Sequence, residues 1–150
     1  MKTELTVRAT HEGGMQVRAT NGAFHLLMDY PMNVEDDAAG PTPLTVLLES
    51  LAACSVNSVM LVLKKMQQPV SGLEVEVRAL RRTEHPTVLT SISLEFAVKG
   101  EGVDPAAVTR ALQLSEDRLC PIWNMLKGGT AIKAGFHLEP SVEPEAAKTR

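Results

Sequence analysis

A long apolar segment that lies between two prolines constrains this chain more than any other part of its sequence. Residues 44–66 carry aliphatic or small side chains on nearly every face that a helix would present. Thr42 offers a hydroxyl for the N-cap and Pro43 suits the first helical position, whereas Pro69 disfavours a helical conformation of the residue before it. The pattern predicts a helix over residues 43–67, about 37 Å long at roughly 1.5 Å per residue.

A helix that is apolar on almost every side must be covered by partners on several sides. A small domain rarely surrounds a helix of this length, so we expect a second copy of the chain to complete its burial in a homodimer. We do not expect the segment to cross a membrane, because polar and charged side chains interrupt it. The interrupting residues are Glu49, Ser50, Asn57, Ser58, Lys64 and Lys65.

The regions on either side of this helix alternate polar and apolar side chains, which is typical of strands. A second helix is predicted to start at Asp104 and Pro105, its N-cap and first helical residue, and to break or kink at Pro121. This order of elements predicts an α+β fold with antiparallel sheets around a long buried central helix, and not an alternating βαβ arrangement. The expected strands cover residues 3–10, 15–20, 24–29, 72–82, 88–100 and 130–139.

The size and charge of the chain limit its domain organisation and its partners. Its 150 residues, 44% of them hydrophobic, suit one compact domain, which we place at residues 1–139. The charged and proline-broken segment 140–150 is expected to be a disordered tail. A net charge of -3, few aromatic residues and no basic run argue against nucleic-acid binding. Because the N-terminal residues lack the apolar core of a signal peptide, we expect a soluble, cytoplasmic protein.

Two cysteines are the first candidates for chemistry. Cys54 lies inside the long helix, where it is either a small apolar core residue or a reactive thiol. Cys120 lies directly before Pro121, at a helix corner that we expect to be accessible to solvent. If the fold brings the two thiols together, one can be oxidised by a peroxide to a sulfenic acid and the other can resolve it to a disulfide. Neither a C-x-x-C motif nor a second pair of zinc ligands is present, so we expect no metal and no cofactor.

A cysteine nucleophile with a histidine base, as in some hydrolases and transferases, is a further alternative. His25 and His137 lie on predicted strands and are the plausible bases, whereas His11 and His85 are expected in turns. A strand histidine is more often a structural residue, and the sequence contains no motif of such an enzyme.

The segments around both cysteines resemble a known family. GPTPLTVLLESLAACSVNSVMLVLKKM resembles the central-helix segment of the OsmC/Ohr family, the osmotically inducible and organic hydroperoxide resistance proteins. LSEDRLCPIWNML resembles the second-cysteine segment of that family, and LKKM is more similar to its OsmC-like branch than to its Ohr branch. The resemblance covers nearly the whole chain except the tail. It implies an intertwined α+β homodimer with the long helices at its centre.

The resemblance also implies an activity. Peroxidase members of the family reduce organic or inorganic hydroperoxides without metal or haem, as part of the response to oxidative stress. Cys54 matches their peroxidatic cysteine and Cys120 matches their resolving cysteine. A lipoyl-type dithiol or another small thiol would then reduce the disulfide.

The sequence departs from the peroxidase members at the charges that polarise their thiol, an arginine on the first hairpin and a glutamate at the start of the central helix. Arg18 and Glu49 are the nearest candidates here. Regular strand geometry turns Arg18 away from Met15, the position that matches the family arginine. Glu49 lies about 140° round the helix from Cys54. The alternative is therefore a non-enzymatic dimer that binds a small apolar ligand, or a redox sensor that uses the same cysteines.

Overall fold

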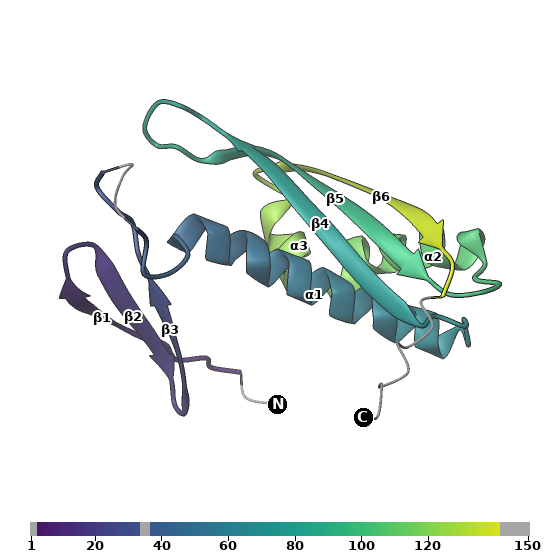
Figure 1. The fold of residues 1–150 in the computed structure, drawn as a ribbon. Coiled ribbons are helices and arrows are strands. Elements are labelled where there is room, and N and C mark those ends of the chain that lie inside the picture. Colours follow the sequence, from purple (N-terminus) through teal and green to yellow (C-terminus); the bar gives the residue numbers. More distant parts are fainter. Residues whose placement is uncertain (1–2, 34–36, 142–150) are drawn as a thin grey trace, which may run out of the picture. The chain divides into compact units, whose positions relative to one another are not determined.

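The computed structural model describes residues 3–33 and 37–141. The chain divides between Leu48 and Glu49 into two compact units, each with a three-stranded sheet of its own (Figure 1). Residues 142–150, which form most of the predicted tail, lie outside the described residues.

The first unit contains an antiparallel meander whose turns depend on glycine. Gly14 and Gly22 have positive φ angles of 53° and 79°, which glycine adopts without steric cost. The strands of this sheet are β1 (Arg8–Gly13), β2 (Gln16–Asn21) and β3 (Phe24–Met28).

The first strand differs from its predicted position at residues 3–10. β1 starts at Arg8 and runs through His11, which was expected in a turn. The reason is that the turn uses only Gly14 and Met15, so the chain before them remains paired with β2. A shift of register between His11 and Gly13 absorbs the extra residue.

The predicted long helix is confirmed as α1 (Pro43–Lys65). The backbone N–H of Thr45 donates to the Thr42 hydroxyl at 3.2 Å, which is the predicted N-cap bond. Beyond Lys65 the chain leaves the helix through Gln67, whose φ is 54°. The buried side chains of α1 are Leu51, Ser55, Ser58, Val59, Val62 and Leu63.

The sheet of the second unit is mixed, so the prediction of purely antiparallel sheets is wrong for this unit. β4 pairs antiparallel with β5, whereas β6 pairs parallel with β5. The connection from β5 to β6 contains helices, and such a crossover returns the chain in its original direction. The α+β class itself is confirmed. The strands are β4 (Gly72–Arg81), β5 (Leu89–Lys99) and β6 (Ala131–Glu139).

The predicted second helix lies in the connection between β5 and β6, where it is divided into two helices. α2 (Pro105–Leu114) continues into a π-helical turn, η1 (Ser115–Leu119), and the chain restarts as α3 (Pro121–Leu126). The break at Pro121 was predicted, and the π-helical turn before it was not. Asp104 caps α2 as expected, because its carboxylate accepts from the Ala106 N–H at 2.9 Å.

The core of the second unit lies on one face of its sheet. Alternate residues of β5 are buried, while Ser93 and Glu95 between them are exposed. Leu51, Val59 and Leu63 of α1 are completely buried. The core residues of β5 and α2 are Leu89, Ile92, Leu94, Phe96, Val98, Ala107, Val108, Ala111 and Leu112.

Candidate active site

The structure brings the two cysteines together. Cys54 comes from the middle of α1 and Cys120 from the residue between η1 and α3. The Cys120 thiol lies 2.7 Å from the Cys54 sulfur, although 66 residues separate them along the chain. Both are free thiols. Because a disulfide bond joins sulfurs about 2.05 Å apart, oxidation of this pair to a disulfide would require only a small movement.

The two thiols differ in their exposure to solvent, and the difference is the reverse of what the sequence predicted. Cys120 was expected at an accessible corner, but its side chain is completely buried. Cys54 is only half-buried. The corner does form, but the side chain at it turns inward, where the Trp123 N–H donates to the Cys120 sulfur at 3.4 Å. A reagent from solvent therefore has better access to Cys54.

Pro121 accounts for the backbone conformation of Cys120. A proline disfavours the helical conformation of the residue before it, and Cys120 is extended, with φ -93° and ψ 101°. The Cys120 N–H donates to the Ser115 carbonyl at 3.0 Å, which closes the wide π-helical turn. Such turns are frequent at functional sites.

Backbone donors from the first turn of α3 reach both sulfurs. The Trp123 N–H donates to Cys120, and the Ile122 N–H donates to Cys54 and lowers the pKa of Cys54. Donors of this kind stabilise a thiolate, because they favour the charged form of the group.

The net effect of the surroundings is nevertheless a raised pKa for Cys54. Burial is the largest cause, since it disfavours the charged form. The neighbouring Cys120 raises the pKa further, because a proton shared between two thiols is harder to remove. Among the described residues, no charged side chain contributes to this shift. Cys54 is therefore mostly protonated at neutral pH.

Arg18 and Glu49 are the two charged residues that were predicted to activate Cys54, and the structure describes the surroundings of each. Arg18 lies on β2 of the first unit, where its guanidinium pairs with the Glu12 carboxylate, one Nη2–Oε2 distance being 3.0 Å. This ion pair raises the pKa of Arg18 and lowers that of Glu12. Glu49 is exposed on α1. Their role in activating Cys54 stays a prediction.

Three buried serines lie beside the cysteine pair, and no pattern in the sequence marked them. Ser55 and Ser58 lie on α1 beside Cys54, and Ser115 begins the π-helical turn. The Ser55 hydroxyl lies 3.8 Å from the Cys120 sulfur. Ser58 and Ser115 are joined by an oxygen–oxygen distance of 2.6 Å.

His137, the strand histidine of the second unit, contacts two carboxylates through its two ring nitrogens. His137 on β6 lies between two carboxylates, with Nε2 2.9 Å from Glu139 and Nδ1 3.3 Å from Glu95. Two hydrogen bonds raise the pKa of His137. The bond to Glu139 has the larger effect, and the bond to Glu95 has the smaller one. His25 lies on β3 in the first unit, on a strand as predicted. Within residues 3–33 and 37–141, no three His, Cys, Asp or Glu side chains gather where they could hold a metal ion.

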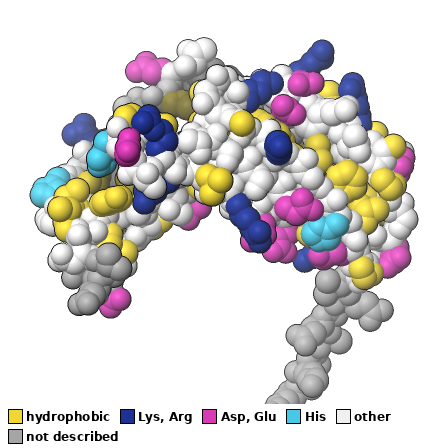
Figure 2. Space-filling view, turned by 90° about the horizontal axis from the view of Figure 1, so that it is seen from above, with side chains coloured by type: hydrophobic (Ala, Val, Ile, Leu, Met, Phe, Trp, Pro, Cys, Tyr) yellow, Lys and Arg dark blue, Asp and Glu magenta, His cyan; other side chains and the backbone are white. Residues whose placement is uncertain are grey.

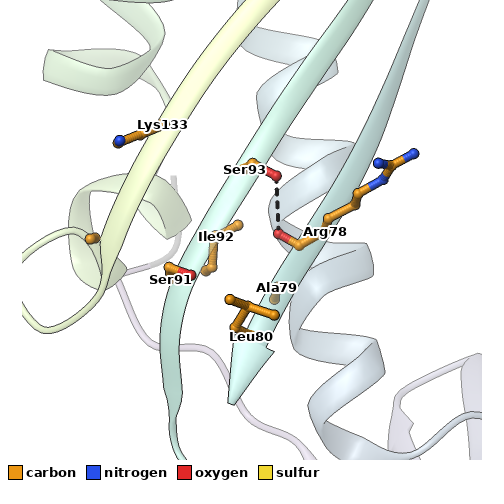
Figure 3. Close-up of a pocket in the computed structure, with 8 residues that line it drawn as sticks. Arg78, Ala79, Leu80, Ser91, Ile92, Ser93 and Lys133 are labelled. Carbon is orange, nitrogen blue, oxygen red and sulfur yellow. Dashed lines mark hydrogen bonds between the residues drawn. The ribbon is translucent and has the colours of Figure 1, made fainter.

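A hollow of about 370 Å³ lies on the sheet of the second unit (Figure 3). The Ser93 hydroxyl donates to the Arg78 carbonyl at 3.5 Å beside it. The side chains of Arg78 and Lys133 point away from one another, so they do not converge on a common ligand (Figure 3). The lining contains no cysteine or histidine: it consists of Arg78, Ala79, Leu80, Ser91, Ile92, Ser93, Ala131 and Lys133.

Comparison with known proteins shows that the part of the chain containing both cysteines matches a protein family. A protein-family model described as "OsmC-like protein" matches residues 35–135. Protein YhfA of Escherichia coli strain K12 is 34% identical over 98 residues, which are 65% of this chain and 73% of YhfA.

Two solved structures show the same fold. An OsmC-like protein from Mycoplasma pneumoniae superposes with a TM-score of 0.79 at 22% identity, over 92% of this chain and 99% of that one. An organic hydroperoxide resistance protein from Elizabethkingia anophelis superposes with a TM-score of 0.69 at 20% identity, over 93% of this chain and 100% of that one.

Proposed function

Because the chain belongs to the OsmC-like protein family, we propose that it is a cysteine-based hydroperoxide reductase in which Cys54 is the nucleophile and Cys120 the resolving thiol. The observation that carries this proposal is the 2.7 Å separation of the two sulfurs, one half-buried and the other completely buried. Structural neighbours that include an organic hydroperoxide resistance protein support a peroxide-related role.

The reaction would proceed in two steps on these sulfurs. The Cys54 thiolate attacks one oxygen of the peroxide O–O bond, an S–O bond forms, and the other oxygen leaves as an alcohol or water after taking up a proton. Cys120 then attacks the sulfenic acid at Cys54, an S–S bond forms, and the hydroxyl leaves as water. The donor from Ile122 would stabilise the attacking thiolate.

The cycle requires a reductant and, we propose, a second copy of the chain. A small thiol or a lipoyl-type dithiol would supply two electrons to the disulfide and restore both thiols. The homodimer would cover the parts of α1 that one chain leaves open, such as Leu61, which is 47% exposed.

A redox sensor, or a non-enzymatic binder of small apolar ligands, is the second candidate. The raised pKa of Cys54, to which no charged side chain of the described residues contributes, favours it. In a redox sensor, the same disulfide would form slowly and persist. The signal would then be the presence of the disulfide, and not the turnover of peroxide. The rate of peroxide consumption separates this candidate from the first.

Substitution of each cysteine tests the proposal. The fully reduced protein is mixed with cumene hydroperoxide or hydrogen peroxide, and peroxide loss, free thiols and the mass of the chain are followed. Cys54→Ser should abolish peroxide loss, because it removes the nucleophile. Cys120→Ser should react once and retain one sulfenic acid per chain, since its resolving thiol is absent.

A matched control and a clear contrary result complete this test. Ser93→Ala, on the exposed face of β5, should behave as the native protein does. Unchanged peroxide turnover in Cys54→Ser would exclude the reductase proposal. A wild-type disulfide that forms only over hours, without turnover, would favour the sensor.

A further inference from the structure

The interface between α1 and the π-helical turn contains polar groups where a core usually contains apolar ones. Ser55 and Ser115 are completely buried and Ser58 is 7% exposed. Burying a hydroxyl is unfavourable unless it is hydrogen-bonded, so buried hydroxyls are found where their bonds hold a particular geometry. All three lie next to the segment that carries Cys120.

The protons of two of these hydroxyls can be assigned by counting donors. Ser58 contacts the carbonyls of Cys54 and Ser55, each at 3.0 Å. A carbonyl only accepts, so the single Ser58 proton is directed to these two groups. The Ser115 hydroxyl, 2.6 Å from Ser58, is then the donor of that contact. Ser115 is therefore bonded through Ser58 to the backbone of α1 at Cys54.

The other end of the π-helical turn is held to the same helix. The Ser55 hydroxyl lies 3.8 Å from the Cys120 sulfur. A thiolate has no proton to donate, so Ser55 must be the donor when Cys120 is ionised. The Cys120 N–H in turn donates to the Ser115 carbonyl at 3.0 Å. Both ends of the turn are thus bonded to the part of α1 that carries Cys54.

We propose that Ser55, Ser58 and Ser115 are positioning residues that hold Cys120 against Cys54, and that Ser55 also stabilises the Cys120 thiolate during disulfide formation. The chemistry of this step rests on the proposed function. The Cys120 thiolate attacks the Cys54 sulfenic acid, the S–S bond forms as the S–O bond breaks, and the hydroxide that leaves takes up a proton to become water. Ser115 and Ser58 keep the two sulfurs at a separation from which this attack needs little movement.

The two ends of the network have different expected effects. Removing the Ser55 hydroxyl withdraws a hydrogen bond to a charged sulfur, so Ser55→Ala should slow disulfide closure about tenfold. Its pH profile should move to higher pH, because the Cys120 thiolate then forms less readily. Removing the Ser115 hydroxyl loosens the turn without touching the sulfur, so Ser115→Ala should slow closure about fivefold and leave the pH profile unchanged.

The experiment measures closure separately from the first attack on peroxide. Sulfenic acid is trapped with dimedone and counted by mass spectrometry, while closure is followed through the fluorescence of Trp123, the only tryptophan of the chain and a neighbour of Cys120. Both alanine variants should form sulfenic acid at the native rate and accumulate it. Ser55→Thr, which keeps the hydroxyl, should retain the native pH profile, and Ser93→Ala serves as the control.

A second measurement does not depend on peroxide. Equilibration with dithiothreitol gives the reduction potential of the Cys54–Cys120 disulfide, and Ser115→Ala should make that disulfide easier to reduce because its thiols are held together less well. If the native protein ignores peroxide but this shift appears, the reductase proposal fails and the positioning network stands. Native closure rates and pH profiles in Ser55→Ala, or a native potential in Ser115→Ala, would overturn the network.

Discussion

At the scale of single residues, the candidate site depends on the difference between two neighbouring thiols. Cys54 is half-buried and receives the Ile122 N–H, whereas Cys120 is completely buried and receives the Trp123 N–H. In the proposed reaction the outer thiol meets the oxidant, and the inner one is protected until a sulfenic acid forms beside it. This asymmetry supports the assignment of the two proposed roles.

The pH dependence of the first attack follows from the raised pKa of Cys54. The thiolate is the nucleophile, so the rate should rise about tenfold per pH unit until the pH passes the pKa. Because burial and Cys120 raise that pKa above the ordinary 9.0, the rise should continue through neutral pH. Stopped-flow measurement of sulfenic acid formation checks this.

The neighbouring thiol provides the control for that profile. Cys120→Ser removes the second cause of the shift, so the pKa of Cys54 should fall and the profile should move to lower pH. A rate that is already constant at neutral pH would contradict the prediction, since it would require a cation near Cys54.

The sequence and the structure contributed different residues to the site. The cysteines could be identified from the sequence because thiols are rare in this chain, with only two present. The serines could not, because a serine on a helix is common and only tertiary contacts distinguish Ser55 or Ser115 from an exposed one. The inward orientation of Cys120 is likewise a tertiary property.

At the scale of elements, the restart of the chain at α3 determines where Cys120 points. Proline at the first helical position removes the helical option for the residue before it, and this part was predictable. The π-helical turn was not, because the extra residue in it is held by the bond between Ser115 and Ser58 across to α1. Local propensity carries no information about such a bond.

Two prolines at equivalent positions allow a paired test of this element. Pro121→Ala should slow disulfide closure several-fold, because Cys120 is then free to adopt a helical conformation that redirects its sulfur. Pro105→Ala, at the first position of α2, should leave closure unchanged. There, Asp104 still holds the cap through its bond to the Ala106 N–H.

The readout for this pair is the rate of disulfide formation in reduced protein after a single addition of peroxide. Circular dichroism confirms that both variants keep the native helix content. Equal closure rates in the two variants would show that the proline does not control the orientation of Cys120.

At the scale of the whole molecule, α1 has two contrasting properties. By length and composition alone it could cross a membrane, contrary to the expectation from its polar interruptions. Its buried residues Leu51, Val59 and Leu63 instead belong to the core of the second unit. On the face shown in Figure 2, basic and acidic side chains are interspersed over the surface. These features suit a core helix in a protein with a mixed charged surface.

The incomplete burial of α1 carries the dimer prediction. Light scattering of the reduced protein should give twice the mass of one chain. Leu61→Asp should shift the equilibrium toward monomer, because it places a charge on an apolar part of α1 that is 47% exposed in one chain. Leu80→Asp, on β4 and 69% exposed, should not. A native protein that is monomeric in this measurement would contradict the dimer prediction.

The amino-acid sequence alone was sufficient to predict the long helix, its cap, the break at Pro121, the α+β class and the two cysteines worth testing. Each of these follows from interactions between neighbours along the chain: capping, proline geometry and the period of apolar side chains. Three features became visible only in the folded chain: β6 runs parallel to β5, Cys120 faces inward, and serine hydroxyls join the turn to α1. Those features depend on contacts between residues dozens of positions apart, which no local pattern encodes.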